Sequence, residues 1–170
     1  MKKIFFVVAL FLSVAAAAQV TNVTIQASGL TCSMCSNAIN KAIKSLDFVD
    51  KVEANIKKSS FDISFKPGTT VDFDKLKTKV EDAGFFVAVF TATINFDNVT
   101  VQNDTHVNAG SNTFHFLNIK GQTLNGNKTI RILDKGFIPA KEYKKNSSLT
   151  KMQCYKTGEE NGKRIFHVTI

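Results

Sequence analysis

The sequence predicts an α+β protein: a ferredoxin-like βαββαβ domain over residues 19–92, then a small, mostly β domain over residues 93–170. Three observations predict the first domain. Apolar residues alternate with polar ones near its start, recur at helical spacing in the next segment, and then alternate again in two neighbouring runs. A second helical segment and a last apolar run complete the order.

The first strand is predicted over residues 21–27, where Val23, Ile25 and Ala27 fall on one side. Gly29 ends this strand. From Ser33 the spacing becomes helical, with one apolar face made of Ala38, Ile39, Ala42, Ile43 and Leu46.

Two short runs follow, at residues 49–56 and 61–65, with the polar segment Lys57-Lys58-Ser59 between them. They predict a β-hairpin. Asp72 is a suitable N-cap for a second helix, and Gly84 stands where a glycine commonly ends one. Residues 85–92 predict the last strand of this domain, and six phenylalanines are expected in the core: Phe61, Phe65, Phe73, Phe85, Phe86 and Phe90.

The second half lacks a helical pattern of comparable length. Five runs are strand candidates, at residues 94–96, 99–107, 113–119, 129–133 and 164–170. Turn signals separate them, among them Asp97-Asn98 and Asn125-Gly126-Asn127. Short strands at this spacing are typical of a small barrel or sandwich, of which an OB-like barrel is one form. Residues 140–151 are expected to form a short helix or a loop.

Residues 1–18 have the pattern of a secretory signal peptide. Lys2 and Lys3 precede the apolar run Ile4 to Leu12, and Ala16-Ala17-Ala18 matches a cleavage site. The apolar stretch ends before the roughly 20 residues that a membrane span needs. We therefore expect an exported protein, in the bacterial periplasm, that keeps no membrane span after cleavage.

The formal net charge of +8 raises the question of nucleic-acid binding. The lysines are scattered, and no nucleic-acid-binding motif is evident, so a solvated basic surface explains the charge better. We expect no nucleic-acid partner.

The pair Cys32-Ser33-Met34-Cys35 is the most informative motif. It lies between a predicted strand and the first turn of a predicted helix, where the helix dipole favours thiolates. Two thiolates on a loop suit a soft ion such as Cu(I) or Hg(II). The same motif is also found in thiol–disulfide exchangers, and a structural disulfide is a third interpretation. The pattern of the cysteines alone leaves these three open.

The segment GLTCSMC, followed by NAINKAIKSL and later by DAGF, resembles the heavy-metal-associated domain family over about residues 20–92. The resemblance implies a βαββαβ fold with Cys32 and Cys35 as the metal ligands. Gly29 and Thr31 match the family loop, Leu30 replaces its usual methionine as a buried support, and Phe85 matches the aromatic residue beneath the loop.

The resemblance also implies a function: binding Cu(I) and handing it to a metal-exchanging protein partner, without enzymatic activity. Periplasmic mercury-binding proteins are similar to this pattern too, so Hg(II) is an alternative ion. The additional residues 93–170 modestly favour copper. A thiol–disulfide redox protein that uses the same cysteine pair is a rival interpretation, and an interaction module regulated by metal is another.

The second half contains all three histidines, His106, His115 and His167, together with Met152 and Cys154. One hypothesis is a second soft-metal site made of Met152, Cys154 and His167, which would receive or relay the ion. We favour instead surface histidines and a buried cysteine, because no two of the histidines have a ligand-like spacing. Cys154 could alternatively link two molecules by a disulfide.

Overall fold

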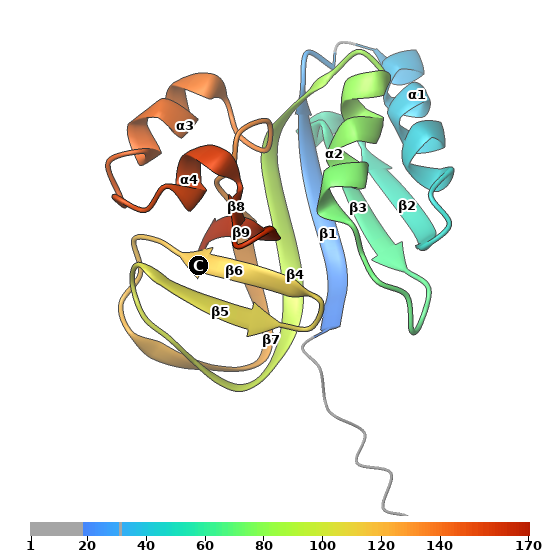
Figure 1. Ribbon diagram of the computed structural model, residues 1–170. Helices are drawn as coiled ribbons and strands as arrows, with labels where there is room; N and C mark the ends of the chain where they lie inside the picture. The colour runs from blue at the N-terminus through green and yellow to red at the C-terminus, as the bar shows by residue number, and fades with distance from the viewer. Residues whose placement is uncertain (1–18, 31) are drawn as a thin grey trace, which may run out of the picture.

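The computed structural model describes residues 19–30 and 32–170, so the predicted signal peptide and Thr31 lie outside the described residues. Figure 1 shows the βαββαβ order of the first half. Its elements are β1 (Gln19–Ser28), α1 (Ser33–Lys44), β2 (Val49–Asn55), a 3₁₀ turn (Ile56–Lys58), β3 (Ser60–Phe65), α2 (Phe73–Asp82) and β4 (Phe86–Val101). The predicted ferredoxin-like arrangement is confirmed.

The second half adds strands and two short helices. They are β5 (Thr105–Ala109), β6 (Asn112–Phe116), β7 (Gln122–Ile132), α3 (Ala140–Asn146), α4 (Cys154–Thr157), β8 (Glu159–Glu160) and β9 (Lys163–Thr169). Residues 140–151 thus contain the expected short helix, α3. No helix in the described part of the chain has the length and apolar character that crossing a membrane requires.

All strands except β8 follow one path in a single sheet, in the order β2-β3-β1-β4-β7-β9-β6-β5, and β8 pairs with β9. The pairs are antiparallel except for β6 with β9, which run parallel. Within the described residues the path runs open from β2 to β5, and an OB-like barrel is not confirmed. The strands after residue 92 instead extend the sheet of the first half.

The strand β4 joins the two halves. It is 16 residues long, pairs with β1 along one edge and with β7 along the other, and contains the predicted boundary between residues 92 and 93. The predicted turn at Asp97-Asn98 is a register shift inside this strand, between the pairs Phe96–Gly126 and Val99–Leu124. Asn98 has a φ of +49°, a conformation that asparagine tolerates and that a β-bulge uses. Turn-forming residues therefore mark a bulge here, and the strand continues.

One hydrophobic core extends across both halves. Phe73 of α2 packs against Phe90 of β4 and Phe166 of β9, with ring centroids 5.5 and 5.2 Å apart. Phe90 also packs against Phe137, at 5.1 Å. Helices α1 and α2 lie side by side over the first half (Figure 1). The first half and the C-terminal strands are therefore packed together.

The strands β6 and β9 are covered on both faces. Phe114, Phe116 and Phe166 belong to the core that includes α2. His115 and His167 alternate with them in sequence and are also fully buried. Because successive side chains on a strand point to opposite faces, these histidines point to the other side of the sheet, toward α4. A buried polar layer therefore lies under α4.

Candidate metal centres

The first candidate centre is the cysteine pair at the start of α1. Cys32 is the N-cap residue, with extended φ and ψ of −147° and 157°, and Cys35 falls in the first turn. The Cys35 backbone N–H donates to Cys32 Sγ at 3.2 Å. The sulfurs are joined as a disulfide, with the two Cα atoms 5.4 Å apart. Both sulfurs thus converge at the positive end of the helix dipole, where the thiolate form is favoured.

The pair is open to solvent, and two large apolar side chains beside it are exposed. Cys32 is exposed and Cys35 is half-buried. Met34, between them, is 82% exposed, and Phe86 at the start of β4 is 73% exposed. Phe86 pairs with Ser28, the last residue of β1 before the cysteine loop. The expectation that Phe86 lies in the core is wrong, because the alternation along β4 buries Val87 instead.

The loop residues expected to support the pair occupy suitable positions. Gly29 has a φ of +82°, which favours glycine over residues with a Cβ atom. Leu30 and Phe85 are half-buried and pack against the main core. Thr31, the remaining residue expected in this loop, lies outside the described residues. Leu30 therefore joins the cysteine loop to the core, against which Phe85 also packs.

A βαββαβ fold with a cysteine pair at the start of its first helix defines a class of small metal-binding domains. This chain belongs to the heavy-metal-associated domain family, whose model matches residues 24–86. It is 33% identical over 70 residues to the copper chaperone CopZ of Bacillus subtilis, covering 38% of this chain and 93% of the chaperone.

Other relatives match a similar share of the chain. A probable copper-exporting P-type ATPase of Archaeoglobus fulgidus is 34% identical over 64 residues, which span 38% of this chain but 8% of the ATPase. Among solved structures, oxidized MerP from Ralstonia metallidurans CH34 is 30% identical and covers 42% of this chain and 96% of its own, with a TM-score of 0.37. The family model ends at residue 86, near the start of β4.

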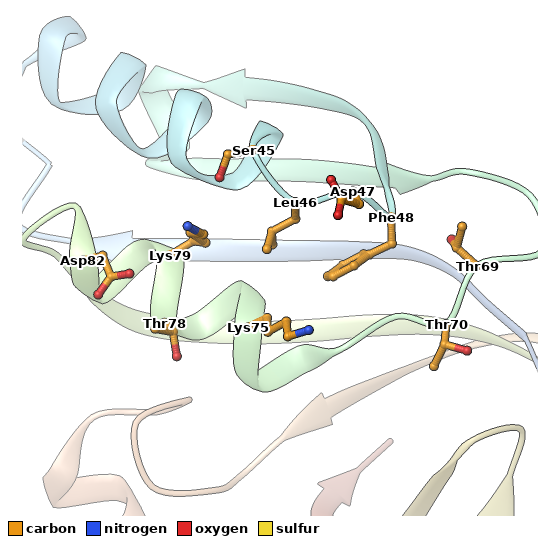
Figure 2. Close-up of a pocket in the computed structure, with 10 residues that line it drawn as sticks. All are labelled: Ser45, Leu46, Asp47, Phe48, Thr69, Thr70, Lys75, Thr78, Lys79 and Asp82. Atoms are coloured by element: carbon orange, nitrogen blue, oxygen red, sulfur yellow. The ribbon is translucent and has the colours of Figure 1, made fainter.

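A surface hollow of about 690 Å³ lies at the other end of α1 (Figure 2). Leu46 and Phe48, which follow the helix, line it together with Lys75 and Lys79 of α2. Cys32 and Cys35 begin the helix, and neither lines this hollow. The hollow is therefore separate from the cysteine pair.

The predicted second site consists of Met152, Cys154 and His167, and the structure brings two of these together. His167 Nε2 lies 3.4 Å from Cys154 Sγ, and both residues are buried. Met152 is 40% exposed. Met152 precedes the short helix α4, which begins at Cys154. Because this described segment is not extended, Met152 and Cys154 do not share one face. Because Cys154 is only 4% exposed, a disulfide between two molecules is disfavoured as well.

Two further histidines, His106 and His115, lie against Cys154. The expectation of surface histidines is wrong for His115 and His167, which are both 0% exposed. His106 and His115 each have a ring nitrogen 3.5 Å from Cys154 Sγ. The pairing of β5, β6 and β9 brings the three histidines together. Their positions in the sequence are too far apart to predict this proximity. The signal in the sequence is a histidine flanked by apolar residues in Phe114-His115-Phe116 and again in Phe166-His167-Val168.

Burial shifts the pKa values of His115 and Cys154. Desolvation, helped by the neighbouring His167, lowers the pKa of His115 from 6.5 to about 4, although Asp104 opposes the shift. Burial also raises the pKa of the Cys154 thiol. At neutral pH the side chain of His115 is therefore a neutral imidazole with one nitrogen lone pair.

Proposed function

We propose that this protein is an exported Cu(I) carrier or buffer, which binds the ion through Cys32 and Cys35 and passes it to a protein partner. The observation that carries this proposal is the convergence of the two sulfurs at the exposed N-terminus of α1. Membership of the heavy-metal-associated domain family supports metal binding by this domain. Cu(I) is the proposed ion, and export to the periplasm rests on the signal-like residues 1–18.

The chemistry of the pair suits transfer. Two thiolates provide the low coordination number that a soft Cu(I) ion accepts, whereas Zn(II) takes four ligands. Since Cys32 is exposed, a thiolate of the partner can approach the ion and replace Cys32 and Cys35 in turn. No bond of a substrate is made or broken other than metal–sulfur bonds, so we propose no enzymatic role for the pair.

The apolar side chains beside the pair support docking of a partner. Met34 and Phe86 are both large and mostly exposed; Met34 lies between the two cysteines, and Phe86 pairs with Ser28, which precedes the cysteine loop. Exposed apolar residues close to a reactive site are typical of an interaction surface. CopZ is a copper chaperone, and its similarity over residues of this domain supports a copper-transfer role here.

A competition titration tests the proposal. Mature protein is reduced and titrated with Cu(I) against a chromophoric Cu(I) chelator, in a Cys154→Ser background that leaves only the pair as thiols. We expect one tightly bound ion, and none after adding Cys32→Ser and Cys35→Ser. Tight binding that survives in the triple variant would contradict the proposal. A parallel titration with Hg(II) shows which soft ion the pair prefers.

A thiol–disulfide function is the second candidate, because Cys32 and Cys35 are disulfide-bonded in this structure. It predicts rapid exchange with a model disulfide and a reduction potential in the range of disulfide oxidoreductases. A pair that is inert in this exchange assay, while binding Cu(I) when reduced, eliminates it.

A further inference from the structure

Three histidines occupy neighbouring positions on three adjacent strands. His106 of β5 is paired with His115 of β6 in the antiparallel register, and His115 is paired with His167 of β9 in the parallel register. The ring centroids of His106 and His115 are 4.5 Å apart, and those of His115 and His167 are 5.0 Å apart. The register therefore places one row of imidazoles across the sheet.

Cys154 projects from α4 onto this row. Its Sγ atom lies 3.5 Å from His106 Nε2, 3.5 Å from His115 Nδ1 and 3.4 Å from His167 Nε2. Tetrahedral coordination, with metal–nitrogen bonds of about 2.0–2.1 Å and a metal–sulfur bond of about 2.3 Å, separates sulfur from each nitrogen by about 3.6 Å. The observed sulfur–nitrogen separations match this value. The ligand atoms of His106, His115 and Cys154 also lie within 4.8 Å of one another, and His167 Nε2 stands outside that group but lies 3.4 Å from the same sulfur.

The outer nitrogen of each imidazole faces a different carboxylate. Glu160 Oε2 is 2.9 Å from His106 Nδ1, Asp104 Oδ1 is 2.9 Å from His115 Nε2, and Asp134 Oδ1 is 2.7 Å from His167 Nδ1. Metal-binding histidines almost always donate their second N–H to such a partner, which fixes the ring and the tautomer. This arrangement occurs three times around one sulfur.

The ring protons of the three imidazoles and the proton of the Cys154 thiol explain why this cluster suits a cation. An ionised carboxylate only accepts, so each outer nitrogen carries the ring proton, and each inner nitrogen of a neutral imidazole presents a lone pair. Three lone pairs then face a thiol that has a single proton to donate. One cation at the centre would satisfy the three nitrogens and the thiolate together.

The ligands are held rigidly. Cys154 is 4% exposed, and His115 and His167 are 0% exposed. Asp134, which orients His167, also accepts the backbone N–H of His167 at 3.2 Å and is paired with Arg164 at 2.9 Å. His106, with a side chain 22% exposed, lies next to the more exposed Glu160, and this side provides an entry path.

We propose that His106, His115, His167 and Cys154 form a second metal site for a divalent ion of borderline softness, Zn(II) or Cu(II). Three imidazoles and one thiolate are ligands that such ions prefer, and a closed four-ligand set is typical of a structural site. The site is independent of Cys32 and Cys35, because β4 and β7 separate β1 from β9 in the sheet. Those three strand spacings amount to about 14 Å along the sheet, so the two ligand sets hold separate ions.

The test uses the whole mature protein with Cys32→Ser and Cys35→Ser, so that the first site is absent. Zn(II) and Cu(II) are titrated separately, and Co(II) serves as a spectroscopic probe of tetrahedral coordination. We expect one equivalent of Zn(II) or Cu(II), with X-ray absorption showing three nitrogen ligands and one sulfur ligand. Failure of both ions to bind stoichiometrically to this folded variant would overturn the second site. It would leave the Cu(I) proposal for the pair untouched.

Two further variants test the ligands and their orientation. Adding Cys154→Ser should remove the sulfur ligand from the X-ray absorption spectrum. Glu160→Gln keeps the side-chain shape at a position 45% exposed and should weaken metal affinity by about 10- to 100-fold, since it removes the carboxylate that orients His106. Glu159→Gln changes the same charge one residue away and should leave the affinity unchanged. A spectrum without sulfur in the parent variant, or equal effects of Glu159→Gln and Glu160→Gln, would contradict the assignment.

Discussion

Phe73 of α2 packs edge to face against Phe166 of β9, with ring centroids 5.2 Å apart, and so joins the metal-binding domain to the C-terminal strands. Phe73 is fully buried and lies 6.4 Å from Phe114 of β6 as well. Because apolar contacts of this kind stabilise both partners, the two halves should unfold together.

The first prediction follows from this shared core. Phe73→Ala should lower the free energy of unfolding of the whole chain by about 3–5 kcal/mol, because it removes a buried aromatic ring and leaves a cavity. Denaturant unfolding followed by circular dichroism and by tyrosine fluorescence should give coincident transitions, since Tyr143 and Tyr155 both lie in the second half. Two separate transitions in the unsubstituted protein would show that the halves are independent.

Phe86→Ala is the matched control for this experiment. Phe86 is the same residue type but is 73% exposed. Its replacement should change the free energy of unfolding by less than about 0.5 kcal/mol, as is usual for surface positions. A loss similar to that of Phe73→Ala would show that Phe86 is covered in solution.

Local patterns are sufficient to predict the first half. The helical spacing after Ser33 and the cap at Asp72 both depend on neighbours within one or two turns, and both match the observed α1 and α2. The length of β4 cannot be predicted in the same way. Asp97 and Asn98 have the preferences of a turn, but pairing with β7 on both sides of them carries the strand through as a bulge.

The histidine cluster depends on contacts that no local pattern contains. His115 and His167 are paired through a parallel register, and parallel strands are connected by long segments, here residues 117–162. Residue type alone indicates Cys154 and His167 as candidate ligands. It cannot show that His106 and His115 join them, because their proximity to Cys154 arises only once β5, β6 and β9 are paired and α4 packs over them.

The second prediction concerns the cap of α2. Asp72 accepts the backbone N–H of Lys75 at 2.9 Å through its side chain. Asp72→Ala should therefore lower the free energy of unfolding by about 1 kcal/mol, whereas Asp72→Asn, which retains a side-chain acceptor, should cost much less. Equilibrium denaturation of the three proteins measures the difference. Equal losses in both variants would indicate a role other than capping.

The third prediction concerns thiol reactivity. In reduced, metal-depleted native protein, iodoacetamide should modify Cys32 first, because it is exposed, and should modify Cys154 only after denaturation, because it is 4% exposed. Mass spectrometry of peptides from timed samples gives the rate at each cysteine. Rapid labelling of Cys154 in the native protein would mean that α4 opens readily and uncovers the histidine cluster.

The fourth prediction links the disulfide to metal binding. Cu(I) needs thiolates, and the disulfide between Cys32 and Cys35 removes both, so the oxidised protein should bind no Cu(I) at this site. The measurement is a chelator competition on the Cys154→Ser variant, oxidised and then reduced in the same sample. Binding should appear only after reduction, with a stoichiometry of one. Equal binding before and after reduction would place the Cu(I) ligands elsewhere in the chain. If instead only the oxidised form fails to bind Cu(I), the redox state of Cys32 and Cys35 controls metal loading.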